Sequence, residues 1–396
     1  MAANVDPTES DQSKDWLRSQ RQGFYDLKSS MASIQHHDEA VEVDLEYGSG
    51  KWNDEVAWIQ NHIKMRRCVF YIPSESGDRD VCQCGYNKTD HDQIAISNSK
   101  RAVESPETEL KWDFEKHTKT VPTNAFGEIE FVGFGGNTAK FIRVDEKTDK
   151  STMLKLMMKV WGMEKPNLLI SVTGGAQNFN MKPRLRDIFR RGIMKAAQST
   201  GAWIITGGTN AGVMEHVGKA VKDHGLTSTN QKHVVAIGIA SWGVIKNRNV
   251  LEENKASWPA AYCIEELQNQ EECFLDPNHS HFILVDNGTQ YKYATEISFR
   301  AELERKISEM QTDTGEDAMP VPILILVVEG GPGTLETVQN ALKQDTPAII
   351  VKGSGRAADI LSHAFKYAET VEVDAKDKHG VAIKITEKRL SPSLVE

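Results

Sequence analysis

A glycine-rich turn lies between an apolar run and a predicted helix in the last quarter of the sequence. The run Pro322–Val328 is almost continuously apolar, which suits a strand buried on both faces of a parallel sheet. Gly330, Gly331 and Gly333 follow it, and glycines allow a sharp turn and the close approach of another group. Thr334 is a suitable N-cap for the next helix, whose first N–H groups and dipole would point at one place. This arrangement predicts a site for an anion, most often a phosphate.

Two arginines occupy positions that an anionic ligand would explain. Arg300 falls on the apolar face of a predicted helix over residues 295–309, where an unpaired guanidinium would be costly to bury. The alternative is an ion pair with Glu296, four residues earlier. Arg356 follows a Gly-Ser-Gly turn in the first turn of another helix, where the dipole disfavours a cation, unless it is a solvated surface residue. We predict that both arginines bind the anionic part of a ligand, and that the chain folds without either.

Polar and aromatic residues that follow the apolar segment 281–285 could complete such a site. Tyr291 and Tyr293 could stack on a base, or could be half-buried residues at the rim. Asp286 could accept hydrogen bonds from ribose hydroxyls, as acidic residues at strand ends do in dinucleotide folds. The alternative for Asp286 is an Asx-turn.

Three cysteines and a histidine in the N-terminal third raise the question of a metal. Cys82 and Cys84 are followed by His91, and Cys68 lies upstream. Zinc sites usually combine pairs of the C-x₂-C type, whereas this segment has C-x-C and a lone histidine. The spacing therefore favours buried, small cysteines in an irregular segment over a zinc site, and we expect no metal ligands.

The elements that must position these residues follow a regular order. Residues 1–43 are polar without a sustained period and are expected to be mostly disordered. Residues 44–165 form a smaller, irregular α+β part, residues 166–370 alternate strands with helices, and residues 371–396 form a C-terminal extension. We predict strands at 168–173, 202–206, 234–239, 281–285, 322–328 and 348–351. This order specifies a Rossmann-like parallel sheet with flanking helices, and the glycine-bearing loops should meet at one edge as a nucleotide-type site.

Composition excludes several classes of protein. The formal charge of −9 and pI near 5.8 of the 396 residues argue against a nucleic-acid-binding surface. Five cysteines in so long a chain do not form a secreted disulfide framework, and the first residues do not resemble a signal peptide. The longest apolar run, Ile323–Val328, is far shorter than the roughly 20 residues that span a bilayer. We expect a soluble intracellular chain without direct membrane insertion.

Several long motifs resemble one known family. The segment LLISVTGGAQNFNMKPRL and those containing EGGPGTLET and GSGRAADI are similar to the N-terminal homology region of melastatin-type transient receptor potential channels, most of all the ADP-ribose-gated member. The resemblance implies a SLOG-type domain that senses ADP-ribose, with no other cofactor, on the cytoplasmic side of the plasma membrane. It also implies a calcium-permeable, non-selective cation channel, and contacts with its other domains and with subunits of a homotetramer. Because the channel's transmembrane segments are not in this sequence, we expect a fragment.

The resemblance also assigns the ligand contacts. They come from the glycine-bearing loops and from the helices that follow them. The residues are Thr173, Gly174, Asn178, Tyr293, Arg300, Gly331, Gly333, Thr334 and Arg356.

Two other functions compete with a sensor. The motifs GGTNAGVM and GGPGTLET also resemble those of nucleoside-monophosphate phosphoribohydrolases, in which Glu336 would be the catalytic carboxylate. However, Glu329 replaces the proline of that family's motif, and its arginine-bearing motif has no match. We therefore expect no catalytic residues. The third possibility, a pure assembly module, would not require Arg300 and Arg356 at one sheet edge.

Overall fold

The computed structural model describes residues 46–74, 80–103, 112–225, 234–252, 259–265, 271–312, 318–376 and 382–390. The predicted disorder of residues 1–43 lies outside these ranges. The chain divides into two units, Met1–Asp54 and Glu55–Glu396, and every site discussed below lies in the second unit.

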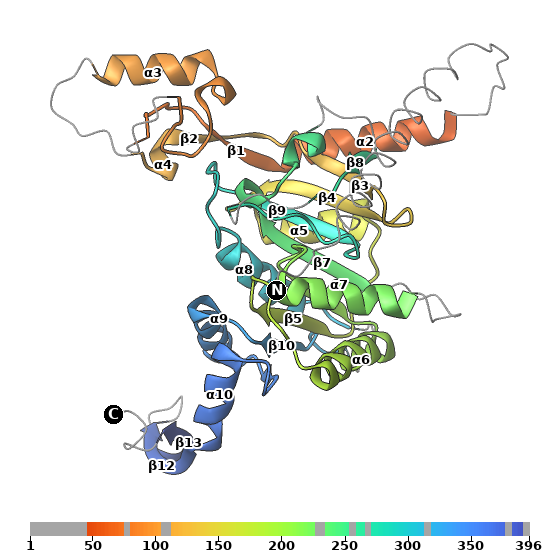
Figure 1. Ribbon diagram of the computed structural model, residues 1–396, viewed down its shortest axis with the longest axis vertical. Helices are drawn as coiled ribbons and strands as arrows, with labels where there is room; N and C mark the ends of the chain where they lie inside the picture. The colour runs from red at the N-terminus through yellow and green to blue at the C-terminus, as the bar shows by residue number, and fades with distance from the viewer. Residues whose placement is uncertain are drawn as a thin grey trace, which may run out of the picture. The chain divides into compact units, whose positions relative to one another are not determined.

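A nine-stranded sheet forms the centre of this unit (Figure 1). Its strands in chain order are β3 (Phe126–Phe131), β4 (Thr138–Asp145), β5 (Leu169–Gly174), β6 (Trp203–Thr206), β7 (Val235–Ser241), β8 (Ala260–Tyr262), β9 (His281–Asp286), β10 (Ile323–Val328) and β11 (Ala348–Ile350). They are arranged in the order β11-β10-β5-β6-β7-β9-β4-β3-β8. All neighbouring pairs are parallel except β3 with β4. The predicted Rossmann-like sheet is confirmed, and each of the six predicted strands is present within about two residues of its expected limits.

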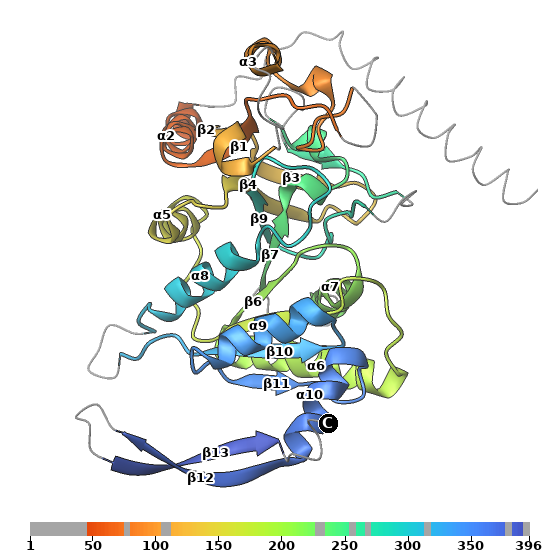
Figure 2. The ribbon, with the colours of Figure 1, turned by 90° about the vertical axis from the view of Figure 1, so that its left-hand side faces the viewer.

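Helices cover both faces of the large sheet, with α5 (Lys150–Lys155) and α8 (Ile297–Ser308) on one face and α6 (Pro183–Thr200) and α7 (Gly212–Gly225) on the other (Figure 2). The other α-helices in the described ranges are α2 (Glu46–His62), α3 (Gln93–Val103), α4 (Phe114–His117), α9 (Pro332–Leu342) and α10 (Arg356–Lys366). Alternation along β5 shows how the faces divide. Leu169 packs in the core cluster that contains residues of α5 and α8, whereas Ile170 and Val172 pack with α6 and α7.

Local sequence signals explain the limits of α6. The apolar spacing after Pro183 predicts a helix over 183–200, and α6 has these limits: Pro183 is its first residue, and Gly201 ends it in a left-handed conformation with φ 66°. The residue pattern of 151–161 also predicts a helix, and the structure has an α-helix only to Lys155, which continues as a π-helical turn, Leu156–Val160. No helix within the described ranges combines the length and the apolar character that crossing a bilayer requires.

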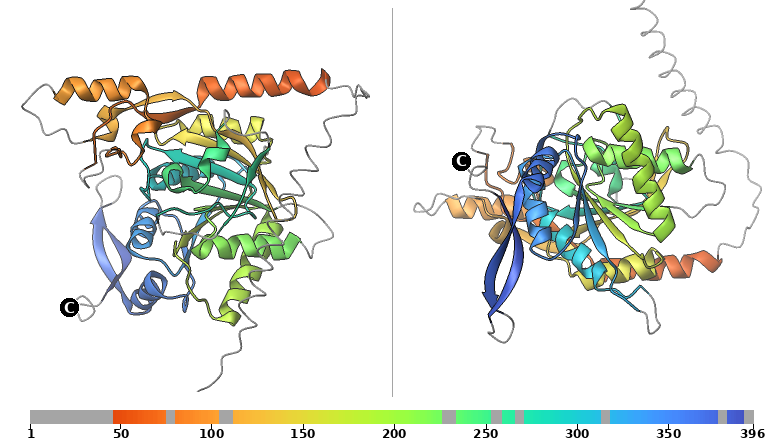
Figure 3. Two further views of the ribbon diagram at one scale, coloured as in Figure 1. Left: turned by 45° about the horizontal axis from the view of Figure 1, so that its top comes forward. Right: turned by 90° about the horizontal axis from the view of Figure 1, so that it is seen from below.

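Two smaller sheets accompany the large one. In the N-terminal part, β1 (Lys64–Cys68) pairs with β2 (Thr118–Pro122) in an antiparallel ribbon. The amphipathic pattern of 53–65 predicts a helix there, and α2 ends at His62, just before β1. In the C-terminal part, β12 (Ala368–Lys376) and β13 (Ala382–Leu390) form an antiparallel hairpin, visible in Figures 2 and 3. β3 and β4, which precede residue 166, hydrogen-bond into the same sheet as the strands of the core, because β4 pairs with β9 in parallel.

A buried charge network ties β1 to the large sheet. Arg66 Nε lies 2.7 Å from Asp145 Oδ1, and Arg143 Nη2 lies 2.7 Å from Asp286 Oδ2. The Arg143 guanidinium also stacks on Trp242, 4.3 Å from the ring centroid. Asp286 accepts a hydrogen bond from the Gly288 N–H at 2.8 Å as well. Each buried charge is therefore paired, as burial requires.

Candidate functional site

A cavity of about 940 Å³ opens at the carboxyl ends of the parallel strands. Its walls come from the loops that follow β5, β6, β10 and β11 and from residues of α8 and α9, and the cavity continues along β10 to the segments that precede β10 and β11. This is the edge at which sheets of this kind bind ligands, and the volume is at the upper end of the usual range for small-molecule sites. The prediction that glycine-bearing loops gather at one edge is confirmed for these four strands.

Eight of the nine residues assigned from the sequence line this cavity. They are Thr173, Gly174, Tyr293, Arg300, Gly331, Gly333, Thr334 and Arg356. The ninth, Asn178, does not line it: its Oδ1 accepts a hydrogen bond from the Gly212 N–H at 3.0 Å. Asn178 therefore joins the loop after β5 to the start of α7, which positions the cavity wall. That any of these residues contacts a ligand stays a prediction.

The ends of β5 and β10 approach so closely that only glycine fits between them. A Cβ atom on Gly174 would lie 1.9 Å from the carbonyl oxygen of Val328, and one on Gly175 would lie 2.1 Å from Oε2 of Glu329. By contrast, a Cβ atom on Gly333 would have no neighbour within 4 Å. The glycines after β5 thus serve packing, whereas Gly333 leaves open space in the cavity wall.

The helix α9 begins at the cavity, one turn earlier than its expected cap. Thr334 is not the N-cap: Gly331 has this position and Pro332 is the first helical residue, a place that proline favours. The Thr334 hydroxyl accepts a hydrogen bond from the Gly331 N–H at 3.3 Å. The positive end of the helix dipole nevertheless lies where the sequence predicted it, among the cavity residues Gly331, Gly333 and Thr334.

Arg300 is fixed by hydrogen bonds beneath the strand ends. Its Nε lies 2.8 Å from Oε1 of Glu304, and its Nη2 donates to the Ser171 hydroxyl at 2.8 Å. Nη2 also lies 3.0 Å from the carbonyl oxygen of Val172 and 3.2 Å from that of Ile205. Because Glu304 is buried and has Arg300 as its cation, the structure gives a reason to expect that removal of Arg300 lowers stability, in place of the expectation that folding is unaffected.

The ion pair considered for Arg300 involves a different glutamate. Glu304, four residues after Arg300, is the partner. Glu296 instead accepts a hydrogen bond from the Ser241 hydroxyl. The guanidinium therefore points along the helix towards the sheet, where it combines a structural role with a place in the cavity wall.

Arg356 lies across the cavity and is held loosely. Its side chain is 61% exposed, and its Nη1 lies 3.4 Å from Oε1 of Glu329. Its backbone has a φ of 41°, and Ala294 and Glu329 have φ values of 69° and 58°. Non-glycine residues rarely adopt such angles, and they concentrate at functional sites where the surroundings enforce them.

Tyr293 lines the cavity, whereas Asp286 does not. Tyr293 lines the cavity and is half exposed, and burial together with Cys273 raises the pKa of its hydroxyl, which therefore remains a hydrogen-bond donor. Asp286 is 1% exposed and does not line the cavity, because its carboxylate pairs with Arg143 and caps the turn at Gly288. The Asx-turn interpretation of Asp286 is thus the correct one. Tyr291 is exposed and lies outside the cavity lining.

Glu336, the carboxylate that a hydrolase would need, does not line the cavity. It is exposed in the second turn of α9. Glu329 is buried, and its Oε2 accepts a hydrogen bond from the Gly330 N–H at 2.6 Å. Neither carboxylate forms a pair of acid and base across the cavity.

A second group of reactive side chains lies away from this cavity. Cys68, Cys82, Cys84 and His91 are all buried, and their ligand atoms lie within 4.8 Å of one another. The spacing favoured buried cysteines over a metal site, and it did not predict that the four side chains meet.

Comparison with known proteins identifies the domain. Residues 139–388, more than half of the chain, match the family described as SLOG in TRPM. The chain is 45% identical over 322 residues to transient receptor potential cation channel subfamily M member 2 of Mus musculus, covering 80% of this chain and 21% of that protein. It is 43% identical over 324 residues to the member-like 2 protein of Nematostella vectensis, covering 81% of this chain and 20% of the relative.

More distant members of the group match over the same part. Subfamily M member 4 of Rattus norvegicus is 37% identical over 310 residues, covering 78% of this chain and 25% of that protein. The chain thus spans between a fifth and a quarter of the length of the relatives that it matches. The predicted resemblance is confirmed, and the chain belongs to the family of melastatin-type transient receptor potential channels, whose SLOG domain it contains.

Proposed function

We propose that this chain is the ligand-sensing domain of a calcium-permeable, non-selective cation channel and that it binds ADP-ribose in the cavity at the strand ends. The observation that carries the proposal is the placement of Arg300, Arg356 and the start of α9 around one cavity of about 940 Å³. Two guanidinium groups and a helix N-terminus offer hydrogen-bond donors of the kind that an anion needs. The pyrophosphate of ADP-ribose is an anion of the matching kind.

The two arginines would act differently on the pyrophosphate. Arg300 is held by Glu304, Ser171 and two carbonyl oxygens, so its charge needs no further ordering when a ligand enters. Arg356 is exposed and has one long contact with Glu329, so it is free to turn towards an anion. A fixed charge lowers the entropic cost of binding, and a mobile one adapts to the ligand.

The non-phosphate parts of the ligand have suitable neighbours in the cavity. The half-exposed ring of Tyr293 offers a stacking surface for adenine, and Gly333 leaves room for a ribose against the backbone. Thr173 and Gly174 would contact the ligand from the end of β5. These assignments extend the residue set derived from the resemblance to the family.

Binding is proposed to be non-catalytic. The carboxylate that the hydrolase motif would supply for water attack at a ribose carbon, Glu336, lies outside the cavity lining, and Glu329 is engaged with Gly330. In a full-length channel, ligand binding would promote gating through the neighbouring domains and subunits of a homotetramer. The domain would then lie on the cytoplasmic side of the plasma membrane.

One experiment separates sensing from hydrolysis and from assembly. Calorimetric titration of this chain with ADP-ribose, followed by chromatography of the recovered ligand, should show saturable binding and unchanged ADP-ribose. Ribose 5-phosphate or free adenine that disappears in Glu336→Ala would establish the hydrolase instead. An absence of binding by a folded chain would favour an assembly module.

A further inference from the structure

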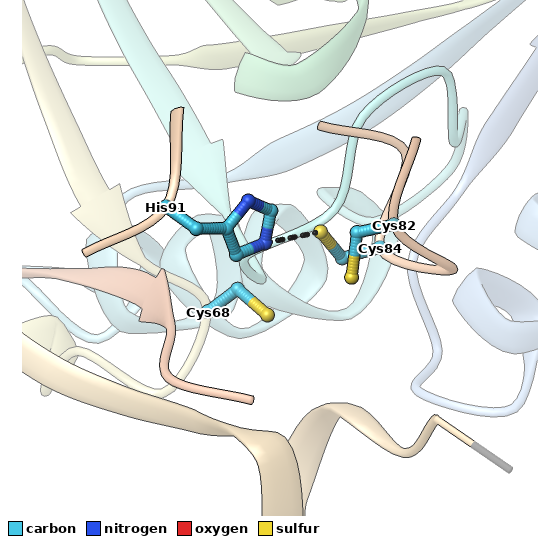
Figure 4. A group of neighbouring side chains, drawn as sticks. All are labelled: Cys68, Cys82, Cys84 and His91. Carbon is cyan, nitrogen blue, oxygen red and sulfur yellow. Dashed lines mark hydrogen bonds between the residues drawn. The ribbon is translucent and has the colours of Figure 1, made fainter. Parts of the chain in front are cut away.

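Four ligand-type side chains converge in the N-terminal part of the chain (Figure 4). Cys68, Cys82, Cys84 and His91 are 6%, 1%, 1% and 9% exposed, and their sulfur and ring nitrogen atoms lie within 4.8 Å of one another. Figure 4 shows the four side chains pointing towards a common centre from separate segments of backbone. Small cysteines buried only for packing would have no reason to direct their sulfur atoms at one point.

Three local structures bring the donors together. Cys68 ends β1, and Cys82 and Cys84 lie in a tight turn closed by the hydrogen bond from the Gly85 N–H to the Cys82 carbonyl at 2.8 Å. Gly85 has a φ of 93°, which the turn requires. His91 follows the short 3-10 helix Lys88–Asp90 and folds back over the turn. The C-x-C spacing therefore supplies only half of the set, and the fold supplies the other two members.

The ring of His91 is oriented as a metal ligand. Its Nδ1 lies 2.8 Å from the carbonyl oxygen of Asn87, which can only accept, so Nδ1 carries the hydrogen. In the neutral ring Nε2 then presents its lone pair, and this atom lies 3.4 Å from Sγ of Cys84. A backbone carbonyl that fixes the tautomer through the other ring nitrogen is the usual support of a metal-bound histidine.

Polar N–H groups also point at the sulfur atoms. The Ile72 N–H donates to Sγ of Cys82 at 3.4 Å, and the indole N–H of Trp112 donates to Sγ of Cys68 at 3.3 Å. Such donors stabilise thiolates. As thiols, Cys68 and Cys82 would share one acceptor, the Phe70 carbonyl oxygen, at 3.3 and 3.9 Å. Buried thiolates need a cation, since no uncompensated charge is stable in such surroundings.

We infer that Cys68, Cys82, Cys84 and His91 bind one structural zinc ion, with three thiolates and the Nε2 atom of the imidazole as its ligands. A tetrahedral set of three sulfurs and one nitrogen is typical of zinc, and four protein ligands close the site to catalysis. Zinc–sulfur bonds of about 2.3 Å place tetrahedral sulfurs roughly 3.8 Å apart. Atoms that already lie within 4.8 Å of one another need only small side-chain movements to reach this geometry. The site replaces the expectation, based on spacing, that these residues bind no metal.

The zinc site would support a loop that leads to the ligand cavity. The Gln290 N–H donates to the Cys84 carbonyl oxygen at 2.8 Å, and a Cβ atom on Gly85 would lie 2.8 Å from the Gln290 carbonyl oxygen. Three residues after Gln290, Tyr293 enters the cavity wall. The metal would therefore fix the backbone on which this wall residue is carried, without contacting the ligand.

Elemental analysis of the purified 396-residue chain tests the site directly. We expect one equivalent of zinc in the wild type, its loss in Cys84→Ser, and its retention in Cys263→Ser, which removes an exposed cysteine outside the cluster. Addition of cobalt to chain prepared without zinc should give the visible absorption bands of tetrahedral cobalt thiolate. Either a folded wild type that neither contains nor takes up zinc, or zinc that survives both Cys84→Ser and His91→Ala, would overturn the site.

A second measurement covers the case in which Cys84→Ser does not fold. Titration of the wild type with an organomercurial in the presence of a coloured zinc chelator should release one equivalent of zinc as the cluster thiols react. Release that begins only after all five cysteines of the chain have reacted, or no release at all, would contradict the assignment. Neither measurement depends on ADP-ribose, so the zinc site and the proposed ligand can fail separately.

Discussion

Nη1 of Arg356 lies 3.4 Å from Oε1 of Glu329, and both residues have positive φ angles, 41° and 58°. The carboxylate is held at the glycine turn by the Gly330 N–H, whereas the Arg356 side chain is 61% exposed. Because the arginine end of this pair is open to solvent and the contact is long, the pair contributes little to stability. The contact therefore places Arg356 at the cavity without committing its hydrogen-bond donors.

Replacement of Arg356 should weaken ligand binding but not folding. We expect Arg356→Ala to reduce the free energy of ADP-ribose binding by about 1.5–3 kcal/mol, the range of a charge-assisted hydrogen bond. This corresponds to roughly a tenfold to more than a hundredfold loss of affinity. Arg356→Lys keeps the charge but not the planar guanidinium group, so its affinity for ADP-ribose should lie between those of the wild type and Arg356→Ala. Calorimetry beside thermal melts would measure both properties, and wild-type affinity in Arg356→Ala would place the ligand elsewhere.

Replacement of Arg300 should affect both binding and folding. Arg300→Ala leaves the buried carboxylate of Glu304 without its cation, and we expect a loss of about 3 kcal/mol in the free energy of unfolding. The double variant Arg300→Leu/Glu304→Leu removes both charges and should recover most of this stability while binding stays weak. Urea unfolding and calorimetry on both variants separate the two roles. If the double variant regained affinity, the role of Arg300 would be structural alone.

Two glycines of the cavity should respond oppositely to alanine. Gly174→Ala would place its Cβ 1.9 Å from the Val328 carbonyl oxygen, and the resulting overpacking should cost about 1–3 kcal/mol of stability. Gly333 lies in α9 with no neighbour within 4 Å of its Cβ, so Gly333→Ala should stabilise the helix by about 0.5–1 kcal/mol. Its added methyl group should nevertheless weaken ADP-ribose binding. Equal melting temperatures for the two variants would contradict the close approach of β5 and β10.

Stability should fall in mildly acidic solution because of His281. Burial, with Lys140 nearby, lowers the pKa of His281 to about 4, below its ordinary value of 6.5. The folded chain thus holds this ring neutral, and the unfolded chain binds the extra proton as the pH falls below 6.5. His281 therefore does not lower the free energy of unfolding above pH 6.5, and it lowers this free energy progressively between pH 6.5 and pH 4. At pH 5 the reduction is about 2 kcal/mol.

A histidine variant isolates this contribution. Urea unfolding at pH 7.5 and at pH 5 should show a smaller difference for His281→Gln than for the wild type. His62→Gln, which replaces an exposed histidine, should keep the wild-type difference. A difference that persists undiminished in His281→Gln would assign the pH dependence to other groups.

The parts of the structure that follow from local pattern were predictable from the sequence. Apolar runs marked the parallel strands, since strands buried on both faces contain little else. Pro183 marked the start of α6, because a proline fixes its own backbone angle at the first helical position. The glycine-bearing loops indicated the edge of the sheet where the cavity lies, because the carboxyl ends of parallel strands meet at one edge.

Relationships through space were not predictable in this way. Glu296 and Glu304 each lie four residues from Arg300 in the sequence. Glu304 is the partner of Arg300 because it also contacts Ser171 of β5, a contact that the sequence does not reveal. Asp286 of β9 forms an ion pair with Arg143 of β4, because β4 and β9 are neighbours in the sheet. Likewise, the position of Cys68 beside Cys84 depends on where β1 ends, which no spacing rule contains.

The place of β5 between β6 and β10 has a consequence for how the chain is made. β5 pairs with β10, a strand that begins about 150 residues later in the chain. At synthesis rates of roughly 5–20 residues per second, β10 leaves the ribosome about 8–30 s after β5. During this interval the apolar strand LISVTG has one open edge, and open edges of apolar strands invite pairing with other chains. The nascent domain therefore depends on protection of this edge, and a chain that terminates before Ile323 would expose it permanently.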